Sequence, residues 1–208
     1  VGVGAVGSLR EGVHPGELLV PDQLIDRTRQ RPSTFFGRGI VAHVAFADPF
    51  CPRLGAALAS AGESAGAKLH RGGVYLCMEG PQFSTRAESN LYRSWGGAVI
   101  GMTALQEAKL AREAEICFAT LALVTDYDCW RHPDADVSIE DILRIMHENV
   151  GTAQRLIATL TGALQGPRSC GCGEALANAI ITDRARIPAQ VKEDLAPILG
   201  RYLGGESS

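Results

Sequence analysis

The sequence lacks several features that would place a chain in a broad class of protein. It has no basic excess, with 20 Lys and Arg against 23 Asp and Glu, which argues against a nucleic-acid binder that must neutralise phosphates. Its longest apolar run, residues 116–124, is too short to span a bilayer. None of its six cysteines forms a CxxC pair, so no structural zinc site is expected.

The cysteines that are present are scattered along the chain. Cys77 and Cys117 lie within apolar, strand-like runs, where small buried thiols are common. Cys170 and Cys172 form a close pair around one glycine. Two interpretations stay open for this pair: reduced thiols in a Gly-rich loop, as cytosolic redox conditions favour, or a disulfide.

The composition of 46% hydrophobic and 21% charged residues over 208 positions predicts one globular domain with a substantial core. Apolar strand-like runs alternate with helical patterns, which indicates an α/β fold around a mixed sheet. We expect strands at residues 1–6, 18–25, 40–46, 73–78, 98–102 and 116–125, and helices at residues 52–65 and 104–114, with another helix that opens at residues 84–85. Thr85 and Glu88 have the spacing of a capping box.

The clearest helix is predicted to begin at Ser138, with Asp141 at capping-box spacing. One apolar face then runs through the helix, formed by Ile139, Ile142, Leu143, Met146, Val150, Ala153, Leu156, Ile157 and Leu160. Residues 166–173 read as a linker. The remaining tail, residues 174–202, is predicted to form two short helices broken at Pro188.

Two aspartates follow the apolar run that ends near Thr125. If the strand continues, Asp126 and Asp128 lie on the same face. Two carboxylates so close do not both ionise readily, and one of them should hold a raised apparent pKa. A protonated carboxyl beside an ionised one suits a 6-aminopurine, which offers an acceptor at N7 and a donor at N6. The alternative is a pair of solvated turn aspartates.

Other candidate ligand contacts have ordinary structural alternatives. Thr103 could meet an anion at a helix N-terminus, or simply cap that helix, and Met102 could pack under a sugar or in the core. Phe83, in a Gly-Pro turn, could stack on a base or anchor its loop. The glycine turn at residues 4–8 could face an anion, and His43 reads as a strand residue.

These residues, taken together, resemble the 5′-methylthioadenosine phosphorylase and purine nucleoside phosphorylase family. The likeness covers residues 5–164, with several motifs in the same order, and the Cys170-Gly-Cys172 tail is similar to the CXC tails of some prokaryotic members. The matching motifs are GSL at residues 7–9, PDQLIDRT at 21–28, HVAFADPFCP at 43–52, EGPQFSTRAE at 79–88, GMTALQEAKLAREA at 101–114 and TDYDCW at 125–130.

The resemblance implies a three-layer αβα fold with a mixed, partly barrel-like central sheet. It also implies phosphorolysis of methylthioadenosine in the cytoplasm by a homo-trimer or homo-hexamer. Phosphate is a co-substrate, and no metal or organic cofactor is needed. In the family, Asp126 matches the residue facing purine N7, where an aspartate favours adenine over 6-oxopurines, and Asp128 matches the one facing N6.

The remaining roles carry over position by position. Phe83 matches the residue that stacks on the base, and Met102 the one beneath the ribose. Thr103 and the turn from Ala5 to Ser8 match phosphate contacts. The 5′ side, which separates methylthioadenosine from nucleosides with a 5′-hydroxyl, is matched by Ser84, Ile139, Ile142 and His43, the last lent to the neighbouring subunit.

The sequence departs from the family at its beginning. Members carry further residues before the position of Val1, including a Gly-rich phosphate loop and an Arg-His pair, and we expect the native start to lie upstream. Gly4 stands where many members have Ser or Thr. The sequence therefore predicts one phosphorylase domain, residues 1–208, without its N-terminal segment and with a Cys-containing helical tail at residues 166–208. The rival hypotheses are a purine nucleoside phosphorylase of broader or 6-oxopurine specificity and a non-catalytic nucleoside-binding subunit.

Overall fold

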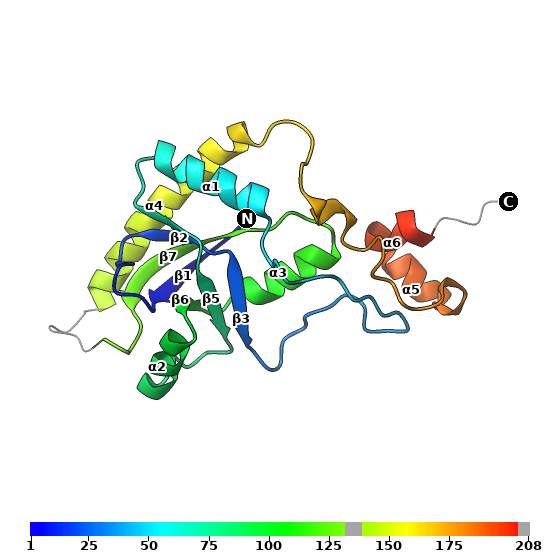
Figure 1. Cartoon of the computed structure of the whole chain (residues 1–208), viewed down its shortest axis with the longest axis horizontal. Coiled ribbons are helices and arrows are strands. Elements are labelled where there is room, and N and C mark those ends of the chain that lie inside the picture. The colour runs from blue at the N-terminus through cyan, green and yellow to red at the C-terminus, as the bar shows by residue number, and fades with distance from the viewer. Residues whose placement is uncertain (132–138, 204–208) are drawn as a thin grey trace.

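The computed structural model describes residues 1–131 and 139–203, and its centre is a mixed sheet of seven strands (Figure 1). The sheet order is β3-β5-β6-β1-β7-β2-β4. Neighbouring strands are parallel except at β1–β6 and β2–β7, which are antiparallel. The strands are β1 (Gly2–Ser8), β2 (Leu18–Val20), β3 (Gln23–Arg27), β4 (Leu69–Arg71), β5 (Val74–Met78), β6 (Gly97–Gly101) and β7 (Thr120–Tyr127).

Helices cover both faces of this sheet. On one face, α1 and α4 pack against each other and against β7 and β2, while α2 covers β6. On the other face lies α3. Figure 1 shows α5 and α6 beside the sheet rather than on it. The helices are α1 (Pro52–Ser64), α2 (Arg86–Ser94), α3 (Ala104–Glu113), α4 (Ile139–Ala163), α5 (Ala189–Asp194) and α6 (Ala196–Leu203). The predicted three-layer α/β fold is confirmed.

Strand β7 shows why its sequence is apolar without alternation. Leu121 and Leu123 enter the core under α1 and α4, whereas Ala122 and Val124 enter the core under α3. A strand buried on both faces has no solvent side on which polar residues would be favoured. The apolar part of β7 therefore lies in the interior, and the strand becomes less buried where it reaches the two aspartates.

Helix α4 confirms the predicted apolar face only in its second half. Ala153, Leu156 and Leu160 are buried against α1 and the sheet. Leu143 and Met146, nearer the start of the helix, are 58% and 41% exposed, and that part of the prediction is wrong. The proposed cap at Ser138 lies outside the described residues.

Three strand predictions need correction. Residues 40–46 form no strand, and only Ala42 makes an isolated bridge, to Ile180. Their alternation reflects packing on the tail, where Ile40, Ala42 and Val44 join one apolar cluster. Pro21 divides the 18–25 run into β2 and β3, since proline cannot donate to a ladder. The last strand begins at Thr120, so Cys117 precedes it and is half-buried.

The C-terminal tail folds on itself. It has two short 3₁₀ turns, at Gly171–Glu174 and Arg184–Arg186, and both α5 and α6 follow Pro188. The expected helix before Pro188 is therefore wrong. Leu176, Ile187 and Leu199 form the centre of a separate small core. In residues 1–131 and 139–203, every helix is too short or too polar to cross a bilayer.

Candidate active site

Three polar segments that follow β5, β6 and β7 meet beside the end of β1. Gly7 of β1 is opposite Ile100 of β6 on one side and Asp126 of β7 on the other. Because β6 pairs only with the last two residues of β1, its carboxyl end and that of β7 lie close together although the two strands run in opposite senses. The register thus gathers three regions singled out in the sequence.

Asp126 and Asp128 lie at the centre of this junction. The hydroxyl of Thr125 donates to Oδ1 of Asp126 at 2.7 Å. The backbone N–H of Asp128 donates to the carbonyl of Ser8 at 3.0 Å. Asp128 is 6% exposed, and among the described residues its buried Oδ2 has no hydrogen-bond partner. A buried carboxylate oxygen without a donor is costly, and it indicates a position where a ligand donates.

The electrostatics of the pair favour a proton on Asp126. Burial raises the pKa of the Asp126 carboxyl, because the charged form loses hydration. The hydrogen bond from Thr125 lowers this pKa, and the negative charge of Asp128 raises it. The net effect is a raised pKa, as the sequence predicted for one member of the pair. Asp126 is thus the member of the pair whose surroundings favour the protonated form.

Gly7 allows β1 to approach both aspartates. A Cβ atom at this position would lie 3.3 Å from Asp126 Oδ2, from Asp128 Cβ and from Ile100 Cγ2. Such contacts are tighter than ordinary packing and would push the carboxylates out of place. Glycine at the end of this strand therefore sets the position of the site.

The loop after β5 is joined to the aspartate segment through Ser84. The Cys129 thiol donates to the Ser84 carbonyl at 3.2 Å, and the Ser84 hydroxyl contacts Met78 Sδ at 3.6 Å. Thr85 then caps α2 in a complete capping box with Glu88, confirming that prediction. Phe83 is 81% exposed beside them. A ring this exposed does not anchor its loop, and stacking on a base stays a prediction.

Met102 and Thr103 follow β6 and face two glycines. A Cβ on Gly80 would lie 2.6 Å from Met102 Sδ, and one on Gly4 would lie 3.2 Å from Thr103 Oγ1. Thr103 is the N-cap residue of α3, but its side chain makes no capping hydrogen bond. Its hydroxyl is therefore directed toward β1 rather than toward its own helix.

The predicted phosphate contacts on β1 differ in their surroundings. Ala5 pairs with Leu123 and is exposed. Ser8 is fully buried, and its hydroxyl donates to the Arg10 carbonyl at 2.8 Å. Trp130 Nε1–H donates to the carbonyl of the same serine at 2.8 Å. Ser8 thus holds the turn after β1 and the segment after β7 together, and its hydroxyl already has a partner.

The structure does not bring His43, a predicted 5′-side residue, to this junction, and it does not describe the side chains of two others. His43 is exposed, and its backbone N–H donates to the Ala179 carbonyl at 2.8 Å, so it lies on the C-terminal tail. Ile139 and Ile142 stand in the first turns of α4, and their side chains lie outside the description. Their roles remain predictions.

Arg31 is a residue of this region that the sequence did not suggest. Its guanidinium donates to the carbonyls of Met78, Glu79 and Met102. It therefore joins the ends of β5 and β6. It comes from the irregular segment after β3, where no periodicity or motif indicates a contact 71 residues away. The only sequence signal for Arg31 is its positive charge in a polar loop, and this charge does not indicate which residues it contacts.

The fold and this junction define an α/β protein that binds a small polar ligand at the edge of a mixed sheet. Residues 1–161 match the family model described as the phosphorylase superfamily. The chain belongs to that superfamily.

Individual relatives agree with this placement. The chain is 55% identical over 204 residues to the S-methyl-5′-thioadenosine phosphorylase of Geobacter sulfurreducens, covering 98% of this chain and 71% of the relative. It is 54% identical to the enzyme of that name from Koribacter versatilis, covering 100% and 71%. This chain is thus shorter than both relatives.

Solved structures are similar as well. A methylthioadenosine phosphorylase from an antarctic soil metagenomic library has a TM-score of 0.90 and 45% identity, with 95% of this chain and 70% of that chain covered. A mutant of the Schistosoma mansoni adenosine/methylthioadenosine phosphorylase, in complex with methylthioadenosine, has a TM-score of 0.72 and 30% identity, with 78% and 63% covered.

Proposed function

We propose that this protein catalyses the phosphorolysis of S-methyl-5′-thioadenosine, which yields adenine and 5-methylthioribose 1-phosphate. The relatives named for this activity support the substrate. The observation that carries the proposal is the aspartate pair. Asp126 has a raised pKa, and Asp128 has a buried oxygen without a donor. This donor and acceptor match N7 and the 6-amino group of adenine.

The reaction needs the purine to leave from a sugar that develops oxocarbenium character. Protonated Asp126 gives its proton to N7 as the glycosidic bond breaks, so that the base leaves neutral. A general acid of this kind contributes about 10²–10⁴ in rate. Asp128 accepts a hydrogen bond from N6. Phosphate attacks the ribosyl carbon from the opposite face, and no metal or organic cofactor takes part in these steps.

We assign the other substrate contacts from the positions of the side chains around the aspartates. Phe83 stacks on the base and Met102 packs beneath the ribose. The Thr103 hydroxyl and the β1 backbone at Ala5 hold phosphate, and Ser8 contributes by fixing the turn after β1. The 5′ methylthio group lies near Ser84.

We assign the apolar wall of the 5′ side to Ile139 and Ile142 of α4. His43 reaches this side from a neighbouring copy in a homo-trimer or homo-hexamer. Its side chain is exposed, which leaves it available for a contact across an interface. We place the enzyme in the cytoplasm, as the family resemblance implies.

The test is release of adenine from methylthioadenosine with and without phosphate, on this chain and on a version extended at its N-terminus to the length of the relatives. Phosphate-dependent release that falls about 10²–10⁴-fold in Asp126→Asn supports the proposal. The control is Asp183→Asn, which changes an exposed aspartate in the tail.

Other outcomes separate the rival functions. Cleavage of inosine at a rate equal to that of methylthioadenosine would favour a purine nucleoside phosphorylase of broader specificity. Binding of adenine without cleavage in both versions would favour a nucleoside-binding subunit.

A further inference from the structure

Four of the six cysteines of the chain gather at a place away from the aspartates. They are Cys51, Cys117, Cys170 and Cys172, hereafter the cysteine cluster, and their sulfur atoms all lie within 4.8 Å of one another. Cys51 precedes α1, Cys117 precedes β7, and the other two belong to the tail. Three segments far apart in the sequence thus bring their thiols to one point.

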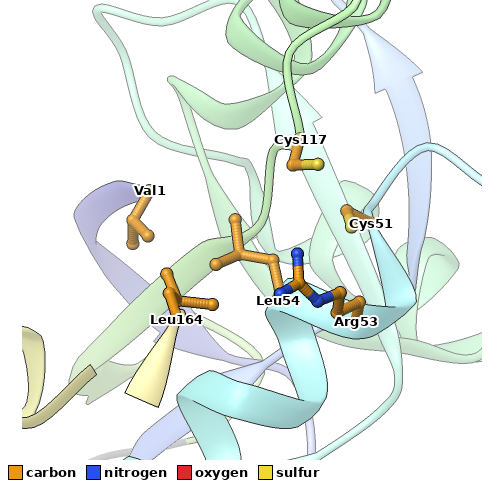
Figure 2. Close-up of a pocket in the computed structure, with 6 residues that line it drawn as sticks. All are labelled: Val1, Cys51, Arg53, Leu54, Cys117 and Leu164. Carbon is orange, nitrogen blue, oxygen red and sulfur yellow. The ribbon is translucent and has the colours of Figure 1, made fainter. Parts of the chain in front are cut away.

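The cluster lies at the edge of the core, at the N-terminal end of α1. Cys51 and Cys172 are buried, while Cys117 and Cys170 are half-buried. All four pack with the apolar cluster that holds Leu54 and Leu160. Figure 2 shows Cys51 and Cys117 close together at one side of a cavity of about 280 Å³. A second cleft, of about 800 Å³, is lined by Cys51, Cys170 and Cys172, so small ions can reach the thiols.

The distances between the sulfur atoms distinguish among a disulfide, a single bound metal ion and an iron–sulfur cluster. The Sγ atoms of Cys117 and Cys170 are 3.4 Å apart, far beyond the ~2.05 Å of a disulfide bond. In a tetrahedral zinc site with Zn–S bonds of ~2.3 Å, the sulfur atoms are ~3.8 Å apart. An iron–sulfur cluster would require several iron and sulfide atoms between the thiolates. Thiols this close leave room for a single ion.

We propose that the cysteine cluster is a structural site for one Zn²⁺ ion, bound by four thiolates. Tetrahedral all-sulfur sites are typical of zinc. On binding, each thiol releases its proton to solvent and its sulfur forms one bond to zinc, and no electron is transferred. All four positions are filled by the protein, so the ion has no open position for chemistry. The site is thus separate from phosphorolysis, whose proposed mechanism needs no metal.

The surroundings offset the charge of such a site, which is two negative charges in total. Cys51 is the N-cap residue of α1, and the positive end of a helix stabilises a thiolate there. Arg53 lines both cavities together with Cys51. The helix end and the guanidinium supply positive potential beside Cys51.

Zinc at this position would fasten the tail to the body of the protein. The tail already contacts Glu115, whose Oε1 accepts from the Leu176 N–H at 2.9 Å and from the Tyr202 hydroxyl at 2.5 Å. Cys117 lies two residues further along the same segment. The ion and Glu115 would hold adjacent parts of the tail. The spacing of the cysteines in the sequence does not predict this arrangement.

The experiment uses the chain without an affinity tag, purified anaerobically and without added thiols. Elemental analysis should find about one zinc per chain. After removal of zinc, addition of Co²⁺ should give thiolate-to-cobalt charge-transfer bands and the ligand-field bands of a tetrahedral ion. The double variant Cys170→Ser/Cys172→Ser should lose the metal and these bands. The control Cys77→Ala, which changes a cysteine in β5 outside the cluster, should keep one zinc.

A thiol titration in denaturant with chelator keeps the proposal testable if the double variant does not fold. The zinc site predicts six free thiols and one released zinc for each unmodified chain. Fewer than six thiols would indicate a disulfide and would overturn the proposal, as would six thiols without metal. Iron in place of zinc would overturn the choice of ion. Tetrahedral cobalt bands that persist in the double variant would overturn the assignment of ligands.

Discussion

The hydroxyl of Thr125 donates a hydrogen bond of 2.7 Å to Asp126 Oδ1. This contact stabilises the ionised carboxylate and so lowers the pKa of Asp126, against the larger effect of burial, which raises it. Thr125→Val removes the hydroxyl at nearly constant volume, so the pKa of Asp126 should rise further.

If protonated Asp126 is the acid, its activity is lost as pH rises through the pKa of its carboxyl. The kcat–pH profile of Thr125→Val should therefore keep its activity to a higher pH than the unmodified profile. A shift to lower pH, or identical profiles, would count against Asp126 as the acid.

Asp126→Asn should increase stability at neutral pH while it lowers activity. The pKa of Asp126 is raised in the folded state, so the unfolded chain ionises first as pH increases. The penalty on folding is absent below the unfolded pKa and complete above the folded one. Urea denaturation at neutral pH and at about pH 3 checks this. The gain should appear only at neutral pH, and a variant equally stabilised at both would contradict the titration argument.

Gly7→Ala should impair catalysis because its methyl group would meet Asp126 and Asp128 at 3.3 Å. Overpacking of this kind costs about 1–3 kcal/mol in stability, and displaced carboxylates should lower kcat/KM by about tenfold or more. Gly12→Ala is the matched control, since a Cβ there has no described heavy atom within 4 Å. Equal activity of the two variants would show that Gly7 does not position the aspartates.

Gly4→Ser should improve phosphate binding. Its Cβ would point toward Thr103, with the Thr103 hydroxyl at 3.2 Å as the contact to be accommodated. One added hydrogen bond to a charged ligand is worth about 1.5 kcal/mol or more, so KM for phosphate should fall by about tenfold. Gly4→Ala separates the hydroxyl from the bulk of the side chain. If the alanine variant has the same low KM, the hydroxyl makes no contact with phosphate.

Asn149 fixes α4 to the strand that carries the aspartates. It is 2% exposed, and its Nδ2 donates to the Val124 carbonyl at 2.9 Å. Asn149→Ala removes this hydrogen bond, while the carbonyl keeps the Gly16 N–H as a donor at 2.9 Å, so the fold should lose about 0.5–1.5 kcal/mol. Thr159→Ala, on an exposed position of the same helix, should change stability by less than about 0.5 kcal/mol. Equal losses in the two variants, measured by urea denaturation, would contradict a specific role for Asn149.

The sequence by itself determined the elements whose signals are local. The capping box at Thr85 and Glu88, and the apolar runs of β5, β6 and β7, depend on residues a few positions apart. The order of the family motifs predicts the three-layer fold. The strand predicted at residues 40–46 was wrong. Alternation shows only that every second side chain is buried, and here those side chains pack against the tail although the backbone does not pair as a strand.

Only the tertiary structure decided which distant groups meet. The register of β1 places Gly7 between Ile100 and Asp126, and Arg31 reaches the ends of two strands from a loop without a pattern. The absence of a CxxC pair argued against zinc, yet chain folding brings Cys51 and Cys117 to the Cys170-Gly-Cys172 pair. Contacts of this kind join residues that are far apart in the sequence and depend on how the helices and strands pack. No local pattern in the sequence therefore predicts them.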